Sequence, residues 1–217
     1  MAAVQHIAFA SATDLRLLVL GAHPDDIEIG CAGTILRLVR EQRLADVRWL
    51  VLSGNDNRVA EARSGADAVL GDTPAAVEVH SFRDGFFPYA GEAIKEVFEN
   101  VKSAFAPDLI LTHRRADFHQ DHRLVSELTS QTFRDDLILE YEVPKWDGDL
   151  STPNFYVELP AELAQAKAEL ITTSFPSQVD RHWFTAETFL GLARIRGIEC
   201  RAAGGYAEGF HARKIVW

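Results

Sequence analysis

The chain contains few cysteines and no long apolar run, and each shortage excludes a class of protein. Two cysteines, Cys31 and Cys200, are too few for a disulfide framework and lack the close pairing of a cysteine zinc site. No apolar stretch approaches the roughly 20 residues that cross a bilayer. The first residues also lack the basic segment that opens a signal peptide. We therefore expect a cytoplasmic protein that does not insert into membranes.

Basic residues are scarce relative to acidic ones. The 22 Lys and Arg residues stand against 32 Asp and Glu residues, for a formal net charge of -10 at pH 7. A nucleic-acid-binding surface is usually basic, so this balance argues against nucleic acid as a partner. The length of 217 residues and the hydrophobic fraction of 47% are typical of one soluble globular domain. We predict a single domain over residues 1–217.

Strand-like and helix-like segments alternate over the first part of the chain. Residues 15–21 form a continuous apolar run, as in a strand that is buried on both faces, and apolar residues recur at helical spacing over residues 31–43. Further strands are predicted at 47–52, 77–80 and 109–112, and further helices at 55–70, 93–105 and 124–133. Such alternation predicts an α/β fold, with a mainly parallel sheet and helices on both faces.

The alternation changes in the last third of the chain. The segments predicted there are strands at 137–143 and 155–159, helices at 161–172 and 186–195, and a loop over 201–210. The loop between the two strands is expected to shape the outer part of a pocket. Its Trp146 could stack on a sugar ring, but a buried core tryptophan is the favoured interpretation.

Two of the predicted strands end in loops that are rich in histidine and aspartate. The first loop carries His23, Asp25 and Asp26, and the second runs from His113 to His122. Parallel strands place their carboxyl ends at one edge of a sheet, so we expect the loops to lie together. Imidazole and carboxylate are suitable zinc ligands, and a hydrolytic zinc keeps about three of them and one open position. The two loops together predict a metal-dependent hydrolase.

Each loop alone has a simpler interpretation. Asp25 and Asp26 could cap a helix, and His119 and His122 could lie on a solvated helix face. The rival ligand motifs are absent, namely the dinucleotide fingerprint G-x-G-x-x-G, a P-loop and the G-x-S-x-G elbow of serine hydrolases. The presence of both clusters at strand ends favours the metal site.

Three motifs, AHPDDIEIGCAGTI, DFHQDH and GYAEGF, occur in this order between Leu17 and Phe210. With them the chain resembles the PIG-L/LmbE family of zinc-dependent de-N-acetylases, for which A-H-P-D-D paired with H-x-D-H is highly specific. The resemblance implies a Rossmann-like, three-layer α/β fold. It also implies a Zn²⁺ ion, with Fe²⁺ as the alternative, bound by His23, Asp26 and His122.

The resemblance implies catalytic roles as well. Asp25 would act as general base, and His119 would stabilise the oxyanion or protonate the amine. Asp121 would orient His119 by bonding the far ring nitrogen. Asp117 is expected to order its loop.

Substrate contacts are expected from Arg58, Asp84 and Tyr206. The alternatives are a surface arginine, a turn residue before a glycine, and a packing tyrosine. Arg63 competes with Arg58 for the position at the pocket, and the role of His113 is left open.

The implied reaction is hydrolysis of an N-acetylated amino sugar, such as an N-acetylglucosamine conjugate, to acetate and a free amine. One alternative is hydrolysis of another amide, such as a thiol conjugate or a carbamoyl sugar. Another is a catalytically silent metal-binding or sugar-binding protein, against which the presence of both Asp25 and His119 counts. Similar proteins are commonly oligomers, so a homo-oligomer is expected.

Overall fold

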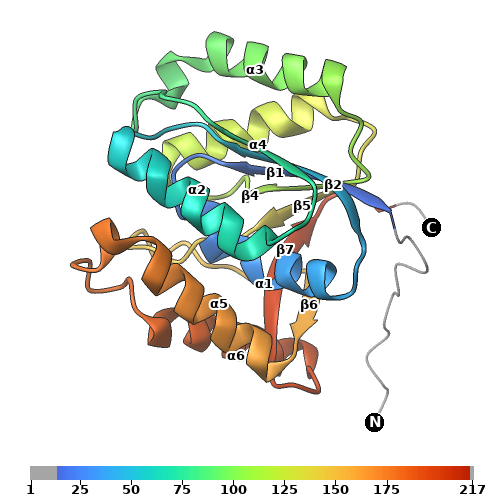
Figure 1. Ribbon diagram of the computed structural model, residues 1–217, viewed down its shortest axis with the longest axis vertical. Coiled ribbons are helices and arrows are strands. Elements are labelled where there is room, and N and C mark those ends of the chain that lie inside the picture. Colours follow the sequence, from blue (N-terminus) through green and yellow to red (C-terminus); the bar gives the residue numbers. More distant parts are fainter. Residues whose placement is uncertain (1–13, 216–217) are drawn as a thin grey trace.

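The structure is a computed structural model that describes residues 14–215 (Figure 1). The expectation about the first residues of the chain concerns positions outside this range. One seven-stranded sheet forms the centre of the molecule, in the order β3-β2-β1-β4-β5-β7-β6. The strands are β1 Leu15–Gly21, β2 Leu44–Val51, β3 Ala75–Val79, β4 Leu109–His113, β5 Ile138–Tyr141, β6 Phe155–Leu159 and β7 Tyr206–Ala212.

The sheet is mainly parallel, as predicted. Strands β1 to β5 pair with one another in parallel, and β7 runs antiparallel to both β5 and β6. The helices are α1 Asp26–Arg40, α2 Asp56–Leu70, α3 Gly91–Ala104, α4 Gln120–Thr132, α5 Ala161–Ser174 and α6 Ala186–Cys200. Two short 3-10 turns lie at Phe87–Tyr89 and Pro176–Gln178.

The helices cover both faces of the sheet, which confirms the three-layer α/β fold. Helices α3 and α4 contact one another on one face, and α1, α2, α5 and α6 pack together on the other (Figure 1). Strand β1 supplies both cores: Leu17 and Val19 face one helical layer, and Leu18 and Leu20 face the other. Each such buried side chain contributes about 1.5–3 kcal/mol of transfer free energy. The unbroken apolar run of β1 is therefore the pattern of a central strand.

Helix starts and the last strand differ from the prediction. Helix α1 begins at Asp26 and α4 at Gln120, each several residues earlier than the apolar periodicity indicates. The first turns of both helices carry polar side chains that face the site described below, so periodicity alone misses them. The predicted loop over residues 201–210 overlaps β7, which pairs with strands that precede it by about 50 residues or more along the chain.

The order of the strands creates a switch point between β1 and β4. The chain leaves β1 for β2 and β3 on one side, then returns to form β4 and β5 on the other. Loops that leave two such neighbouring strands diverge and open a crevice at the carboxyl edge of the sheet. The histidine-rich and aspartate-rich loops follow these two strands. Within residues 14–215, no helix has the length and apolarity needed to cross a membrane.

Candidate metal centre and active site

The loop after β1 brings His23, Asp25 and Asp26 to the crevice. The Oδ2 atom of Asp26 accepts a hydrogen bond of 2.7 Å from the backbone N–H of His23, which folds the loop back on itself. Asp25 occupies the N-cap position of α1, yet its side chain caps nothing. Its φ of 101° is in the left-handed region, which costs a non-glycine residue about 1–3 kcal/mol. The helix-cap interpretation is therefore wrong for Asp25, whose carboxylate lines the cavity.

The loop after β4 brings in two further imidazoles. His119 is the N-cap of α4, and its Nδ1 accepts a 3.3 Å hydrogen bond from the backbone N–H of Asp121. His122 lies in the first turn of this helix and is buried. Asp117 holds the loop by accepting a 2.7 Å hydrogen bond from the backbone N–H of His119. The solvated-face interpretation fails for His122, because the helix turns it toward β1.

Three donor atoms from the two loops converge on one point. His23 Nδ1 lies 3.2 Å from Asp26 Oδ2 and 3.2 Å from His122 Nε2, and the last two atoms are 3.3 Å apart. Ligands about 2.0–2.1 Å from a tetrahedral zinc are separated from one another by about 3.3 Å. The three residues thus fit a zinc ion at their centre. They are the ligands that the resemblance implies.

A carboxylate contacts the second nitrogen of each of these imidazoles. His122 Nδ1 lies 3.1 Å from Asp117 Oδ2, and His23 Nε2 lies 3.2 Å from Asp121 Oδ2. Lys145 Nζ, 2.9 Å from the same Asp117 oxygen, holds that carboxylate in turn. Carboxylates in this position fix the tautomer and the ring orientation of a metal-binding histidine.

Asp121 therefore acts on a different histidine from the one predicted. Its carboxylate contacts His23, and the backbone N–H groups of Gly85 and Phe87 also donate to it, at 2.6 and 3.1 Å. Only the backbone of Asp121 bonds His119. The reason is helical geometry: residues 119 and 121 are two apart at a helix start, so their side chains point in different directions.

The electrostatic environment of His23, Asp26 and His122 favours a bound cation. Burial alone would lower the pKa of His23, but Asp26, Asp121 and Asp84 raise that pKa well above its ordinary value. The pKa of His122 is also raised, by Asp26 and Asp117 against the effect of burial. Burial would raise the pKa of Asp26, but the neighbouring imidazoles hold it well below its usual range. A metal ion and protons would compete for the same lone pairs.

Asp25 is a buried carboxylate beside, and not within, the three donors. Burial raises its pKa to about 7, with a further increase from Asp26 and an opposing effect from Arg58. The Nη2 atom of Arg58 lies 3.0 Å from Asp25 Oδ2. Arg58 also donates to Glu61 and to the carbonyl of Pro24. A carboxylate with a pKa near neutrality is suited to accept and release a proton.

His119 is placed as a neutral hydrogen-bond donor. Burial lowers its pKa, and His122 and His23 lower it further. Because Nδ1 accepts the bond from the Asp121 backbone, Nε2 carries the proton in the neutral ring. His119 lines the cavity next to His23, with ring centroids 4.9 Å apart.

The three predicted substrate contacts fall in different places. Arg58 lines the cavity, whereas Arg63 is exposed and donates to the carbonyl of Val77, which decides between them. Asp84 also lines the cavity, and its Oδ1 lies 3.0 Å from His23 Nε2. Tyr206 begins β7 opposite Leu159 in β6 and is not among the residues that line this cavity.

His113 ends β4 beneath the three donors. Its ring stacks on that of His122, with centroids 3.9 Å apart, and its Nε2 accepts a 2.9 Å hydrogen bond from the backbone N–H of Ala22. The same nitrogen lies 3.3 Å from Asp26 Oδ2. Burial and His122 lower the pKa of His113 to about 4, so the ring is neutral at pH 7. His113 contacts two of the three donors without lining the cavity.

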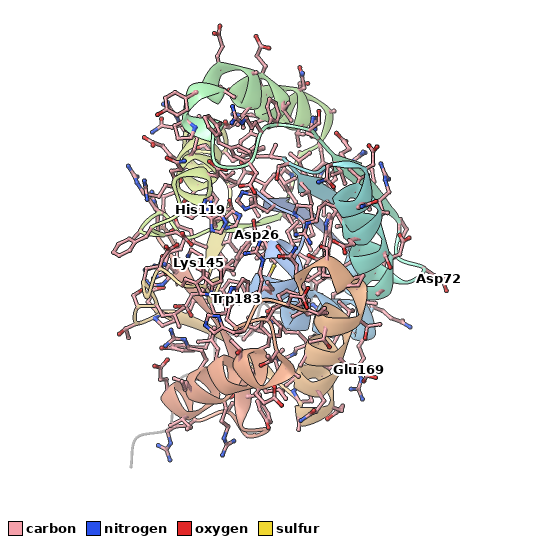
Figure 2. All side chains as sticks on the ribbon, turned by 90° about the vertical axis from the view of Figure 1, so that its left-hand side faces the viewer. Asp26, Asp72, His119, Lys145, Glu169 and Trp183 are labelled. Atoms are coloured by element: carbon pink, nitrogen blue, oxygen red, sulfur yellow. The ribbon has the colours of Figure 1, made fainter. Side chains whose placement is uncertain are left out.

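The cavity above the donors has a volume of about 710 Å³. Figure 2 shows Asp26 and His119 on one face of the molecule, with Lys145 and Trp183 beside them. Trp146 lines the same cavity and is 63% exposed, so the prediction of a buried core tryptophan is wrong. Lys145 and Asp147 also line the cavity, as expected for the loop between β5 and β6. Three lining residues farther along the chain carry no motif and were not predicted: Gln178, Arg181 and Trp183.

The fold recurs in solved structures. N,N'-diacetylchitobiose deacetylase from Pyrococcus horikoshii has a TM-score of 0.71 and 20% identity, over 91% of this chain and 83% of that one. GalB from Pseudomonas putida KT2440, described as the 4-carboxy-2-hydroxymuconate hydratase, has a TM-score of 0.70 and 17% identity. The match covers 94% of this chain and 98% of GalB. Likeness at this identity establishes the fold, and the two activities differ.

Two sequence comparisons establish the family. The chain is 30% identical over 145 residues to the uncharacterized deacetylase YaiS of Escherichia coli (strain K12). This match covers 59% of this chain and 74% of YaiS. Residues 18–133, more than half of the chain, match the family PIG-L, described as GlcNAc-PI de-N-acetylase. That range includes both loops of the candidate site. The chain belongs to the PIG-L family of deacetylases.

Proposed function

We propose that the protein is a zinc-dependent hydrolase that removes the N-acetyl group from an N-acetylated amino sugar conjugate. The observation that carries the proposal is the spacing of His23 Nδ1, Asp26 Oδ2 and His122 Nε2, all 3.2–3.3 Å from one another. A general base and a hydrogen-bond donor, Asp25 and His119, line the same cavity. Family membership supports deacetylation, and the geometry supports the metal.

The three donor residues would hold the ion. A zinc ion bound there supplies two effects, since it polarises the acyl carbonyl and lowers the pKa of a water molecule in its open position. Asp117 and Asp121 keep the two imidazoles in the orientation that exposes their lone pairs to this point.

Asp25 would accept the proton of the attacking water. The water oxygen forms a bond to the carbonyl carbon, and the proton moves to the Asp25 carboxylate. Arg58, 3.0 Å from that carboxylate, holds it in place, and the left-handed backbone at Asp25 aims it into the cavity. A pKa of about 7 is close to the optimum for a base that works at neutral pH.

His119 would stabilise the oxygen on which negative charge develops. Its Nε2–H is available because Nδ1 is engaged by the backbone of Asp121. A positioned donor of this kind accelerates acyl transfer by about 10²–10³. When the C–N bond breaks, the departing nitrogen takes up the proton held by Asp25, and His119 keeps its Nε2 proton. The new carboxyl group then releases the second proton of the water, so that acetate and the amine remain.

The amino sugar is the part of the proposal that rests on relatives. The family description names GlcNAc-PI, and the Pyrococcus horikoshii protein is described as a diacetylchitobiose deacetylase. Asp84, 75% exposed at the cavity, offers a carboxylate to a sugar hydroxyl. A cavity of about 710 Å³ is within the range of sites that hold drug-sized ligands, which suits a conjugate.

The test combines metal content with acetate release. Purified protein is analysed for zinc and incubated with N-acetylglucosamine, diacetylchitobiose, a glucosamine conjugate that carries a thiol-bearing acyl group in amide linkage, and an O-carbamoyl sugar. Zinc near one per chain with acetate release supports the proposal. Zinc with release of another acid or of carbamate moves the substrate to another amide or a carbamoyl sugar. Zinc without turnover of any compound favours a silent binding protein, or the chemistry of a hydratase such as GalB.

A further inference from the structure

The cavity has a second wall, which the proposed chemistry does not use. Its residues come from the last third of the chain, after β5, and are Lys145, Trp146, Asp147, Gln178, Arg181 and Trp183. Figure 2 shows Lys145 and Trp183 of this wall on the same face as Asp26 and His119. The part of a substrate that stays with the amine would extend from the donors toward this outer wall.

Arg181 is the cation of the outer wall that has no acidic partner. Lys145 is engaged by Asp117 and Asp149, at 2.9 and 3.1 Å. Among residues 14–215, no carboxylate lies within 4.0 Å of the Arg181 guanidinium, and its Nη1 and Nη2 atoms donate no hydrogen bond. Asp147, which also lines this wall, lies 3.9 Å from Lys145.

The guanidinium of Arg181 is nevertheless held in place. Its Nε donates a 2.7 Å hydrogen bond to Gln178 Oε1, and its Cζ lies 5.7 Å from the centre of the Trp146 ring. The Trp146 ring also stacks on the ring of His182, with a centroid distance of 5.8 Å and an interplanar angle of 8°. An arginine that is anchored through Nε presents its two remaining nitrogens as a fork, which matches a carboxylate or a phosphate.

We propose that the outer wall is a subsite for an acidic group, carboxylate or phosphate, on the part of the substrate attached to the amine, and that Arg181 binds that group. The chain has a formal net charge of -10, and Arg181 is nonetheless a cation in this cavity that no acidic side chain neutralises, which favours an anion as its ligand. The inference rests on the proposed function, because it describes one end of the same cavity.

Equilibrium binding of reaction products tests the subsite without turnover. The probes are methyl glucosaminide, carboxymethyl glucosaminide and glucosamine 1-phosphate, measured by calorimetry on the zinc-loaded protein. We expect at least one acidic product to bind tenfold or more tightly than the neutral one. Arg181→Gln should lower the affinity for that acidic product about ten- to a hundredfold and change the affinity for the neutral product less than twofold. The product that responds identifies the carboxylate or the phosphate as the group recognised.

Two further variants sharpen the test. Gln178→Leu keeps the charge of Arg181 but removes the hydrogen-bond acceptor of its Nε. The affinity for the acidic product should therefore fall by a smaller factor than in Arg181→Gln. Arg63→Gln, an exposed arginine outside the cavity, removes the same charge and should change none of the three affinities.

The outcomes separate this inference from the proposed function. Equal binding of acidic and neutral products, equal losses for all three in Arg181→Gln, or no binding of any product would overturn the subsite. Acetate release from the matching N-acetylated compounds, measured in parallel, tests the proposed function. Acetate release with equal product affinities would support the proposed function and overturn the subsite. Arg181-dependent binding of an acidic product without acetate release would support the subsite and contradict the proposed function.

Discussion

The carboxylate of Asp121 lies 3.2 Å from Nε2 of His23, across the ring from Nδ1, the nitrogen that faces Asp26 and His122. The two residues are 98 positions apart in the chain. Asp117 stands in the same relation to His122, at 3.1 Å. The site is thus a pair of carboxylate-supported imidazoles joined by one direct carboxylate, Asp26.

Asp121→Asn should weaken zinc binding by about ten- to a hundredfold, because the amide no longer attracts the proton on Nε2 of His23. Asp117→Asn should have a similar effect through His122. Competition with a chromogenic chelator measures both. Asp84→Asn is the matched control: Asp84 also contacts His23 but is 75% exposed, so water replaces it and the zinc affinity should change little. A zinc affinity unaltered in Asp121→Asn would contradict this arrangement.

Asp25→Gly and Asp25→Ala should both lose turnover, by about 10²–10⁴, while zinc content stays at the wild-type value. They should differ in stability. At φ 101° an alanine keeps the backbone strain and a glycine relieves it, so Asp25→Gly should be more stable than Asp25→Ala by about 1 kcal/mol. Urea unfolding of the two variants measures the difference. Equal stabilities would show that the left-handed backbone at Asp25 is not strained.

His119→Asn distinguishes the role of His119 as the N-cap of α4 from its proposed role in catalysis. Asparagine is among the best N-cap residues, so helix α4 should keep its start and the free energy of unfolding should stay within about 0.5 kcal/mol of wild type. Turnover should fall by about 10²–10³, since an amide replaces the imidazole donor in the cavity. His119→Ala should lose turnover equally and also about 1 kcal/mol of stability. Near-normal acetate release by His119→Asn would exclude His119 from the reaction.

Arg196→Met should destabilise the protein by about 3–5 kcal/mol. The Nη2 of Arg196 lies 2.8 Å from Glu142 Oε1, and both residues are about 4% exposed, so the substitution removes the ion-pair partner of a buried carboxylate. Arg196 also donates to the carbonyl of Ser151, which ties the loop that carries Trp146 to α6.

The double variant Arg196→Met/Glu142→Gln is the control for that pair. It removes both charges and should recover a large part of the lost stability. Denaturant unfolding of the single and double variants forms a cycle, and additive losses would contradict a direct pairing.

Local pattern was sufficient for most of the fold. The apolar run of β1 predicted a strand buried on both faces, because Leu17 and Leu18 each face a helical layer. The helix starts at Asp26 and Gln120 were missed, since residues that serve the site interrupt the apolar periodicity. Strand β7 was missed for another reason: its pairing with β5 and β6 is long-range, and no hairpin joins it to either strand.

The sequence by itself determined which chemical groups reach the crevice, because the residues that follow β1 and β4 must lie at the carboxyl edge of a parallel sheet. Only the tertiary structure decided which of these groups meet. It placed Asp121 against His23, turned Arg58 and not Arg63 into the cavity, and left Arg181 without an acidic partner at the outer wall. Periodicity indicates whether a side chain is buried, whereas its partner depends on the packing of elements that lie far apart in the chain.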